Sequence, residues 1–454
     1  MDIAVIGTGY VGLVSGVGFA ELGHRVTCVD SDASKIDRLR RGVLPIYERG
    51  LEALLHRHTA TGHLRFESDP IDAVYRSAAI FIAVGTPPGP QGDPDLSQVQ
   101  AAAQTLAAHV DEYKVIVMKS TVPVGTTRWV HTVIHDLSHD LSHDRRPAPA
   151  LVDVVSNPEF LREGSAVEDF LRPYRIVVGS DSERATAVMA EIYRPLRLRG
   201  TPFLVTSPET AELIKYAANA FLATKISFIN EVANLCEHAG ADVHDVAHAV
   251  GLDGRIGPAF LRAGPGFGGS CFPKDLLALT KMGQRLGHPL RIAETVLEVN
   301  ALQQQRVVQK VQAALDPLED REVAVLGLSF KAGTDDVRDS PAIAICRWLL
   351  EQGVRVRVYD PASMANARAI LNGTVAYCRD AYEAAAGSDA LVVATEWGEF
   401  RDVDFGRVRA LMANPLVIDC RNLLEPKELE SLGFTYLGMG RPRSSAAARL
   451  GATG

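Results

Sequence analysis

One cysteine of the chain lies in surroundings that suit covalent chemistry. Cys271 is in the segment GPGFGGSCFPKD, residues 264–275, where four glycines precede it and Lys274 and Asp275 follow it. Glycines supply backbone donors and let a ligand approach closely, and a nearby cation stabilises the thiolate that acts as the nucleophile. A buried structural cysteine in a turn is the alternative, since cysteine is among the most buried residues. The glycines and the flanking charges favour chemistry at Cys271, whereas the other five cysteines lie in strand or helix patterns that predict packing roles.

Two further pairs of side chains recur at a spacing of four residues. Glu159 and Glu163 lie in SNPEFLREGSA, residues 156–166, and share one face if that segment is helical. They then either border a ligand crevice at the carboxyl ends of strands or stabilise a helix N-terminus, and the spacing leaves both readings open. Lys215 and Asn219 lie in ELIKYAAN, where periodicity alone favours a solvated lysine on the polar stripe of a helix.

A glycine motif near the start of the chain predicts a dinucleotide site. Gly7, Gly9 and Gly12 form a GxGxxG pattern that follows a predicted strand and opens a predicted helix. These glycines permit a tight turn, a close approach of the pyrophosphate and close helix–strand packing, and the helix N-terminus attracts the phosphates. Asp30 ends the next strand, where a carboxylate binds the ribose hydroxyls and repels a 2′-phosphate, so NAD is favoured over NADP.

The elements around these residues follow an α/β pattern. Short β-rich runs alternate with amphipathic stretches over about the first 200 residues, and the pattern resumes after residue 320. Between them, a helix signal at Ser207-Pro208-Glu209 and a stop at Gly240 predict a long helix over 206–240, and a second helix is expected over 291–315. We expect four parts: 1–200, 201–315, 316–440 and a small, polar, basic tail over 441–454 that we predict to be flexible. The predicted strands are 3–6, 25–29, 79–83, 115–119, 152–156, 175–178, 323–326, 355–359, 390–394 and 416–418.

The two α/β parts carry signs of an internal duplication. DIAVIGTG at the start of the chain resembles EVAVLGLS at 322–329, and each is followed by a helix and a strand that ends in aspartate, Asp30 or Asp360. The second copy lacks the full glycine set. We therefore predict an α/β fold with two Rossmann-like, doubly wound domains joined by a long central helix, of which only the first is built for a dinucleotide.

The bulk composition excludes several classes of function. The chain has 454 residues, is 47% hydrophobic and 22% charged, and carries a net charge of −8, which gives no sign of a nucleic-acid or acidic-membrane surface. No apolar run has the length of a membrane span, and the first residues lack the basic region of a secretory signal. Six scattered cysteines without a CxxC pair suit reduced thiols and a cytoplasmic setting. The segment LSHDLSHDRRPAPA, 137–150, is expected to be a solvated loop rather than a metal site, and we predict no metal.

Seven motifs resemble those of the UDP-glucose/GDP-mannose dehydrogenase family, in order along nearly the whole chain. They are GTGYVG (7–12), VGTP (84–87), KSTVPVGT (119–126), NPEFLREG (157–164), KYAANAFLATKISFINE (215–231), GFGGSCFPKD (266–275) and GLSFKAGTDDVRDSP (327–341). The resemblance implies an N-terminal NAD domain, a long central helix at a homodimer interface and a C-terminal UDP-binding domain. It also implies a four-electron oxidation of UDP-glucose to UDP-glucuronate that consumes two NAD.

The resemblance implies roles for individual residues. Cys271 resembles the nucleophile that carries thiohemiacetal and thioester intermediates, Lys215 and Asn219 resemble the groups that stabilise the oxyanion at C6, and Glu159 resembles the general base of hydrolysis. Asp275 and Thr121 resemble residues that hold a water, and Arg255 resembles an arginine that reaches the substrate of the neighbouring subunit. Beyond the glycines, the positions that match NAD contacts are Val11, Asp30, Lys35, Thr86, Thr121, Glu163, Lys274 and Arg338. The positions that match sugar-nucleotide contacts are Glu159, Phe160, Leu161, Arg162, Glu163, Lys215, Asn219, Arg255, Phe260, Leu261, Arg262, Ala263, Gly264, Gly268 and Lys331.

Two alternatives stay open at the level of the sequence. A sibling enzyme that acts on GDP-mannose or a UDP-N-acetylhexosamine shares much of the cysteine loop. A non-catalytic regulator that binds NAD or a UDP-sugar is the other, although the joint presence of Cys271, Lys215, Asn219 and Asp275 argues against it.

Overall fold

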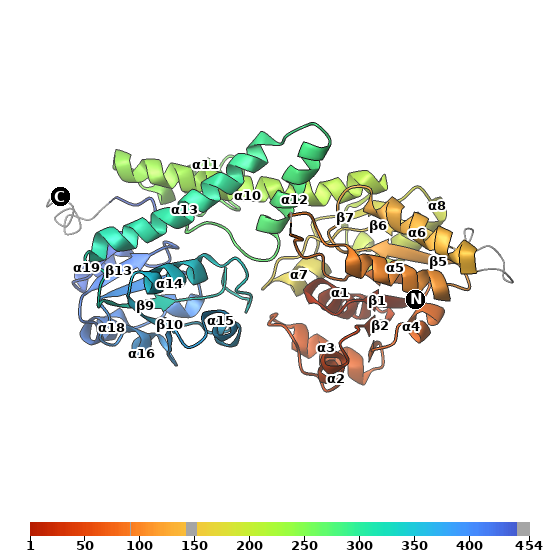
Figure 1. Ribbon diagram of the computed structural model, residues 1–454, viewed down its shortest axis with the longest axis horizontal. Helices are drawn as coiled ribbons and strands as arrows, with labels where there is room; N and C mark the ends of the chain where they lie inside the picture. Colours follow the sequence, from red (N-terminus) through yellow and green to blue (C-terminus); the bar gives the residue numbers. More distant parts are fainter. Residues whose placement is uncertain (91, 142–151, 443–454) are drawn as a thin grey trace. The chain divides into compact units, whose positions relative to one another are not determined.

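The computed structural model describes residues 1–90, 92–141 and 152–442. The chain divides into two compact units, Met1–Ala218 and Asn219–Gly454. One element, the helix α10 (Pro208–Ala239), begins in the first unit and ends in the second (Figure 1). At about 1.5 Å per residue its 32 residues extend over about 48 Å.

The first unit is built on an eight-stranded sheet with the order β3-β2-β1-β4-β5-β6-β7-β8. The first six strands are mutually parallel and follow the Rossmann order, and β7 joins β6 in antiparallel orientation. The strands are β1 (Asp2–Ile6), β2 (Arg25–Val29), β3 (Leu64–Glu67), β4 (Ala79–Ile82), β5 (Lys114–Met118), β6 (Val152–Ser156), β7 (Ile176–Gly179) and β8 (Phe203–Thr206).

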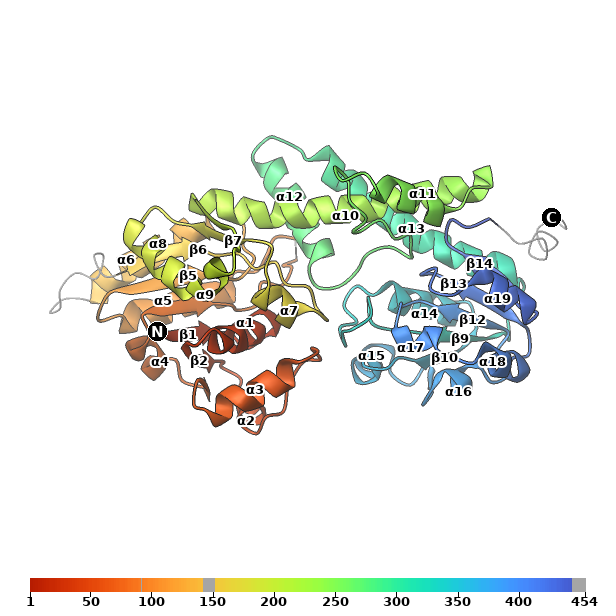
Figure 2. The same cartoon turned by 180° about the vertical axis from the view of Figure 1, so that it is seen from behind.

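Helices cover both faces of this sheet, as the apolar runs of its central strands require. One core joins the sheet to α1 (Tyr10–Glu21), α2 (Ala33–Arg40), α3 (Leu51–Ala60), α7 (Ala166–Leu171), α8 (Glu183–Ile192) and α9 (Arg194–Leu198). The other core joins it to α4 (Ile71–Arg76), α5 (Ser97–His109) and α6 (Thr126–Leu141), and α5 and α6 lie side by side (Figure 2).

The second unit contains a six-stranded, fully parallel sheet with the order β11-β10-β9-β12-β13-β14, which repeats the Rossmann order. Its strands are β9 (Glu322–Leu326), β10 (Arg355–Tyr359), β11 (Ala376–Tyr377), β12 (Ala390–Val393), β13 (Leu416–Asp419) and β14 (Thr435–Gly438). One face packs on α13 (Arg291–Leu315), α14 (Pro341–Glu351) and α15 (Met364–Leu371). The other packs on α16 (Ala381–Ala385), α17 (Gly398–Arg401), α18 (Phe405–Leu411) and α19 (Pro426–Ser431), while α11 (Val243–Gly251) and α12 (Phe272–Arg285) precede the sheet in the chain.

The predicted fold class is confirmed, with two Rossmann-type sheets and a long central helix. The helix expected over 206–240 is α10, and the one expected over 291–315 is α13. The expectation of a loop over 137–150 is wrong at its start, because residues 137–141 complete α6. The remainder of that segment, and the tail from residue 443, lie outside the described residues. The division into parts at residues 200, 315 and 440 stays a prediction.

Candidate active site

The glycine turn after β1 has the geometry that a bound pyrophosphate needs. Gly7 has a φ of +98°, and a Cβ at Gly12 would lie 1.9 Å from the Gly7 carbonyl oxygen, so both positions require glycine. A Cβ at Gly9 would meet no atom within 4 Å, which leaves open space in front of the turn. Gly9 is also the N-cap of α1 and provides no side-chain cap to its amides. The turn therefore presents a helix N-terminus to open space, which fits a dinucleotide pyrophosphate.

Asp30, directly after β2, completes this arrangement. Its Oδ2 accepts hydrogen bonds from the Thr8 amide at 2.8 Å and hydroxyl at 2.7 Å and from Lys35 Nζ at 2.8 Å. Burial alone would raise the pKa of Asp30, but the bonds from Lys35, the Asp32 amide and Thr8 outweigh it and lower the pKa to about 2. The carboxylate is thus charged at neutral pH beside the turn, in the position for ribose recognition.

Four more of the predicted cofactor residues follow strand ends of the same sheet. The Thr86 hydroxyl, after β4, donates to the carbonyl oxygen of Thr121, after β5, at 2.9 Å. Val11 lies in the first turn of α1 and packs on the core of the sheet. Glu163 follows β6, so these positions all belong to the carboxyl edge, where doubly wound sheets bind ligands.

The segment that carries Glu159 and Glu163 is not helical. Residues 157–165 form an irregular stretch before α7, so the shared helical face considered for the two glutamates is wrong. Pro158 disfavours helical geometry at the residue before it, and Gly164 has a φ of +82° that a right-handed helix excludes. The buried Glu159 carboxylate instead accepts from the Leu161 amide. Phe160 lies under the Arg175 guanidinium, which is 3.7 Å from its ring centre, and Arg162 binds Asp169 through its guanidinium.

Lys215 is buried rather than solvated, which corrects the expectation from periodicity. Its Nζ lies 2.8 Å from Glu159 Oε1, and the two side chains are 4% and 6% exposed. Periodicity failed here because a buried ion pair occupies a position that a hydrophobic pattern marks as polar and therefore exposed.

Lys119, which follows β5, is a charged residue of this region that the sequence did not single out. Its Nζ donates to Asn157 Oδ1 at 3.1 Å, and burial lowers its pKa to about 8, with Glu159 opposing the shift and Lys215 adding to it. It begins the motif KSTVPVGT and directly follows a buried strand, and these were the two signals that could have marked it. The first unit therefore gathers Lys119, Glu159 and Lys215 in a buried charge cluster.

In the second unit, Cys271 is the N-cap of α12 and is half-buried, whereas the other five cysteines are buried as predicted. The positive end of the helix dipole stabilises a negative charge on its sulfur. The loop before it is tightly packed, since a Cβ at Gly268 would lie 2.1 Å from the Asp339 carbonyl oxygen. The Gly269 amide donates to the Arg338 carbonyl oxygen at 2.9 Å, which links the cysteine loop to the segment before α14.

Asp275, one turn into α12, is 2% exposed and accepts from two directions. Asn219 Nδ2 donates to its Oδ2 at 2.7 Å, and Lys274 Nζ lies 2.7 Å from its Oδ1. Asn219 belongs to α10, so this pair of bonds ties α12 to that helix within the second unit. Three residues predicted separately are therefore in direct contact.

The segment 260–264 is held by amide side chains of the neighbouring helices. Phe260 has a φ of +64°, and Gly264 donates its amide to Asn230 Oδ1 at 2.8 Å and accepts from Gln303 Nε2 at 2.7 Å. Leu261 and Ala263 are buried and Arg262 is exposed. Arg255, just before this segment, is 89% exposed and pairs with Asp253 at 2.6 Å.

The carboxyl edge of the second sheet gathers cationic side chains. Lys331 follows β9, with its Nζ 5.3 Å from the Phe330 ring centre, and Arg421 follows β13 and donates to the Phe330 carbonyl oxygen at 2.7 Å. The sequence did not single out Arg421, since a lone arginine after a strand carries no motif. Arg338 is engaged by Asp336 at 2.7 Å.

The second copy of the aspartate has a different environment from the first. Asp360 is 1% exposed, and its Oδ2 accepts from the Leu328 and Ser329 amides, the Ser329 hydroxyl and the Trp397 indole. Its Oδ1 accepts from the Ala362 and Ser363 amides. Protein donors fully engage this carboxylate, and that only the first copy is built for a dinucleotide stays a prediction.

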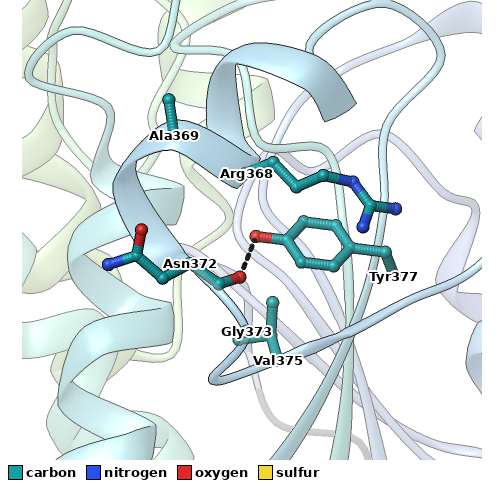
Figure 3. Close-up of a pocket in the computed structure, with 6 residues that line it drawn as sticks. All are labelled: Arg368, Ala369, Asn372, Gly373, Val375 and Tyr377. Atoms are coloured by element: carbon teal, nitrogen blue, oxygen red, sulfur yellow. Dashed lines mark hydrogen bonds between the residues drawn. The ribbon is translucent and has the colours of Figure 1, made fainter.

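A shallow hollow in the second unit lies between α15 and β11, lined by Arg368, Ala369, Asn372, Gly373, Val375 and Tyr377 (Figure 3). The Tyr377 hydroxyl donates to the Asn372 carbonyl oxygen at 3.0 Å, and both residues belong to this lining. None of the predicted site residues lines it.

Within residues 1–90, 92–141 and 152–442, no group of three or more His, Cys, Asp or Glu side chains has a metal-binding arrangement. Over the same ranges, no helix combines the length and apolar character that crossing a membrane requires.

Two Rossmann-type sheets, a glycine turn with its strand-end acid, and a cysteine at a helix start define a nucleotide-dependent dehydrogenase. The chain belongs to the UDP-glucose/GDP-mannose dehydrogenase family, since it matches the family's NAD binding domain over residues 1–197, its central domain over 209–302 and its UDP binding domain over 324–426.

Similar proteins agree over nearly the full length. The UDP-glucose 6-dehydrogenase of Rhizobium meliloti (strain 1021) is 52% identical, with 97% of this chain and 100% of that protein covered. The UDP-glucose 6-dehydrogenase TuaD of Bacillus subtilis (strain 168) is 47% identical, with coverage of 97% and 93%. The solved structure of a UDP-glucose dehydrogenase from Pyrobaculum islandicum superposes with a TM-score of 0.88 at 42% identity and covers 97% of each chain.

Proposed function

We propose that this chain oxidises UDP-glucose to UDP-glucuronate with NAD, through intermediates covalently bound to Cys271. The observation that carries the proposal is the half-buried thiol at the start of α12, one turn from an aspartate that Asn219 and Lys274 hold. The UDP-glucose dehydrogenases of Rhizobium meliloti and Bacillus subtilis, similar over nearly their whole length, support the choice of substrate.

The reaction removes two hydrides from C6 of the glucose and adds one oxygen from water. NAD, bound at the glycine turn, supplies the hydride acceptor for each of the two oxidations. After the first oxidation, the Cys271 thiolate adds to the C6 aldehyde and gives a thiohemiacetal, which keeps the reactive carbonyl bound. Loss of the second hydride from C6 leaves a thioester, and water then releases the carboxylate and regenerates the thiol.

The charge cluster of the first unit suits the stabilisation of oxygen anions. The Lys215 ammonium, in a dry environment, is suited to stabilise the negative charge that develops at the C6 oxygen. Glu159, with its carboxylate beside this ammonium, is suited to take a proton from the attacking water in the hydrolysis. Asn219 follows Lys215 by one turn of α10, and we assign it to the same oxyanion.

The other residues hold the water, the cofactor or the sugar nucleotide in place. Asp275 and Thr121 hold the water of hydrolysis. The glycine turn, Asp30, Lys35, Thr86, Glu163, Lys274 and Arg338 bind NAD, and the segments 159–163 and 260–264 with Gly268 and Lys331 bind the sugar nucleotide. Arg421, which lies beside Phe330, joins this second set.

We also propose that the protein acts as a cytoplasmic homodimer with α10 at the interface. Phe221, Phe228 and Leu235 lie on one stripe of α10 at a spacing of seven residues and are 66%, 53% and 67% exposed. An exposed apolar stripe at heptad spacing is typical of a helix that pairs with a partner. Arg255, exposed in this unit, then reaches the substrate of the partner subunit.

Counting NADH per UDP-glucose tests the proposal. We expect two NADH for each UDP-glucose consumed and less turnover with GDP-mannose or a UDP-N-acetylhexosamine. One NADH per sugar would reduce the protein to an alcohol dehydrogenase, and a preference for another sugar nucleotide would replace the substrate. Cys271→Ser tests the covalent step, because we expect it to block completion of the second oxidation, and unchanged formation of the acid would exclude the thioester.

A further inference from the structure

The loop before α3 carries a buried glutamate that has no role in the chemistry above. Glu48 is 5% exposed, although glutamate is almost never buried without partners. Its carboxylate reaches two segments that are far from it in sequence, the first turn of α1 and the segment before α7.

On one side, Glu48 Oε2 accepts from the hydroxyl of Tyr10, the first residue of α1. Tyr10 directly follows Gly9 and lies within the turn assigned to the pyrophosphate. Its ring is half-buried against the core of the first sheet, so the position of its hydroxyl depends on the position of this helical turn.

On the other side, Glu48 holds the end of the segment that begins with Glu159. Its Oε2 accepts from the Gly164 amide at 2.7 Å and its Oε1 from the Ala166 amide at 2.9 Å. The Gly164 amide is also 2.9 Å from the Tyr10 hydroxyl, so three groups meet at one point. Ser165, the N-cap of α7, makes no side-chain cap bond, and Glu48 therefore supplies this helix with its cap from another loop.

From these contacts we infer that Glu48 is a positioning residue that couples the glycine turn to the segment 159–166. The inference rests on the proposed function, in which the turn binds NAD and residues 159–163 bind the sugar nucleotide. A ligand that fixes the first turn of α1 also fixes the Tyr10–Glu48 contact, and thereby orders the segment that must receive the second ligand. Ordering that is shared by two sites produces positive coupling between them.

The variants separate this role from a purely structural one. Glu48→Gln keeps the size of the side chain but replaces one acceptor oxygen with an NH₂ group, which cannot accept from an amide. Tyr10→Phe keeps Glu48 and its cap of α7 and removes only the hydroxyl. Asp153→Asn is the matched control, because Asp153 accepts from the Tyr113 and Ser182 hydroxyls at 2.7 Å each in the same unit but outside both segments.

The first measurement is the dissociation constant of UDP-glucose by calorimetry, with and without saturating NADH, a pair that does not react. For wild type and Asp153→Asn we expect NADH to tighten UDP-glucose binding by about fivefold or more, within the usual range of coupling. For Glu48→Gln and Tyr10→Phe we expect the ratio to fall towards one while each ligand still binds alone. Unchanged coupling in both variants would overturn the inference.

The second measurement does not depend on the substrate. In wild type, NADH should slow amide hydrogen exchange in peptides that cover residues 159–170, and this protection should be lost in Glu48→Gln and Tyr10→Phe. Protection that persists in both variants would contradict the inference that Glu48 couples the turn to this segment. Failure of wild type to bind UDP-glucose would instead remove the proposed substrate, while the exchange data still decide the link between the turn and the segment.

Discussion

The Lys215 ammonium and the Glu159 carboxylate form a buried ion pair, with 2.8 Å between Nζ and Oε1. Lys119 is a second cation close to this pair, and both Lys215 and Glu159 therefore influence its pKa. Loss of Glu159 therefore leaves two buried cations without their carboxylate, whereas loss of Lys215 leaves a carboxylate that still has Lys119 near it.

This asymmetry predicts unequal effects on stability. Breaking a buried pair from one side costs about 3–5 kcal/mol, and we expect Glu159→Gln to lie at the upper end and Lys215→Met at the lower end. The double variant should be more stable than the sum of the single effects implies. Thermal unfolding of the four proteins measures this, and equal, additive losses would show that the pair is not coupled.

A methyl group added at Gly12 should have a different effect from one added at Gly9. Gly12→Ala places a Cβ 1.9 Å from the Gly7 carbonyl oxygen, so it should lower the unfolding temperature, with a cost of about 1–3 kcal/mol. Gly9→Ala meets nothing within 4 Å and should leave the unfolding temperature unchanged.

In Gly9→Ala the added methyl group instead occupies the space for the pyrophosphate. We expect NADH binding to weaken by about tenfold or more, which corresponds to about 1.4 kcal/mol. Fluorescence titration with NADH checks this, and wild-type affinity in Gly9→Ala would place the pyrophosphate elsewhere.

The cysteines should differ in reactivity. Burial raises the pKa of Cys28, Cys346 and Cys420 to about 12, so these thiols are inaccessible and protonated in the native protein. Brief treatment with iodoacetamide at pH 8 should therefore label Cys271 first, as mass spectrometry of tryptic peptides can show. Cys271→Ala should take up little label, and unfolded wild type should take up all six. Equal labelling of a buried cysteine in native protein would contradict this.

Lys119 predicts a pH dependence of stability. Burial lowers its pKa from 10.5 to about 8, so between these values the unfolded chain binds a proton that the native protein does not. The free energy of unfolding therefore rises with pH over this window. The stability gained in this way is lost again as pH falls from about 10.5 to about 8.

The size of this effect is on the order of 3 kcal/mol for a shift of this magnitude. Lys119→Met should therefore gain stability relative to wild type at pH 7 and lose most of that advantage near pH 10.5. Urea unfolding of both proteins across this range measures the difference, and a difference independent of pH would mean that Lys119 keeps its ordinary pKa.

The apolar stripe of α10 predicts the effect of a charge at its centre. If the protein is the homodimer proposed above, Phe228→Glu should convert it to a monomer of about half the mass, because burying a carboxylate between two paired helices costs free energy. Light scattering after size exclusion measures the mass. Leu198→Glu, at an apolar residue of α9 that is 77% exposed, should leave the mass unchanged, and an unaltered mass for Phe228→Glu would move the interface elsewhere.

The strands that the sequence failed to predict share one property. They are β3, β8, β11 and β14, and they form the two edges of each sheet. Central strands of a parallel sheet are buried on both faces and read as continuous apolar runs, which the sequence shows directly. Edge strands are short and mixed, as in the LRFE of β3, where Arg65 is exposed, so their composition does not distinguish them from loops.

Some residues of the site could be placed from the spacing of the sequence, and others could not. Motifs with a local physical meaning, such as the glycine turn before Asp30, could be placed from spacing alone. Glu159, Lys215 and Lys119 could not, because their contacts join segments about 40 to 100 residues apart and a buried ion pair leaves no periodic signal. Glu48 went unnoticed for the same reason, since its partners Tyr10 and Gly164 belong to other motifs.

The two strand-end aspartates also have a consequence for engineering. Gly7 and Gly327 occupy equivalent turns with φ of +98° and +89°, and their amides donate to the last residue of the neighbouring strand in both copies. Grafting the first glycine motif onto the second would still not create another dinucleotide site. The Asp360 carboxylate already binds the donors of its own loop, so a designer would first have to remove those hydrogen bonds, beginning with the one from the Trp397 indole.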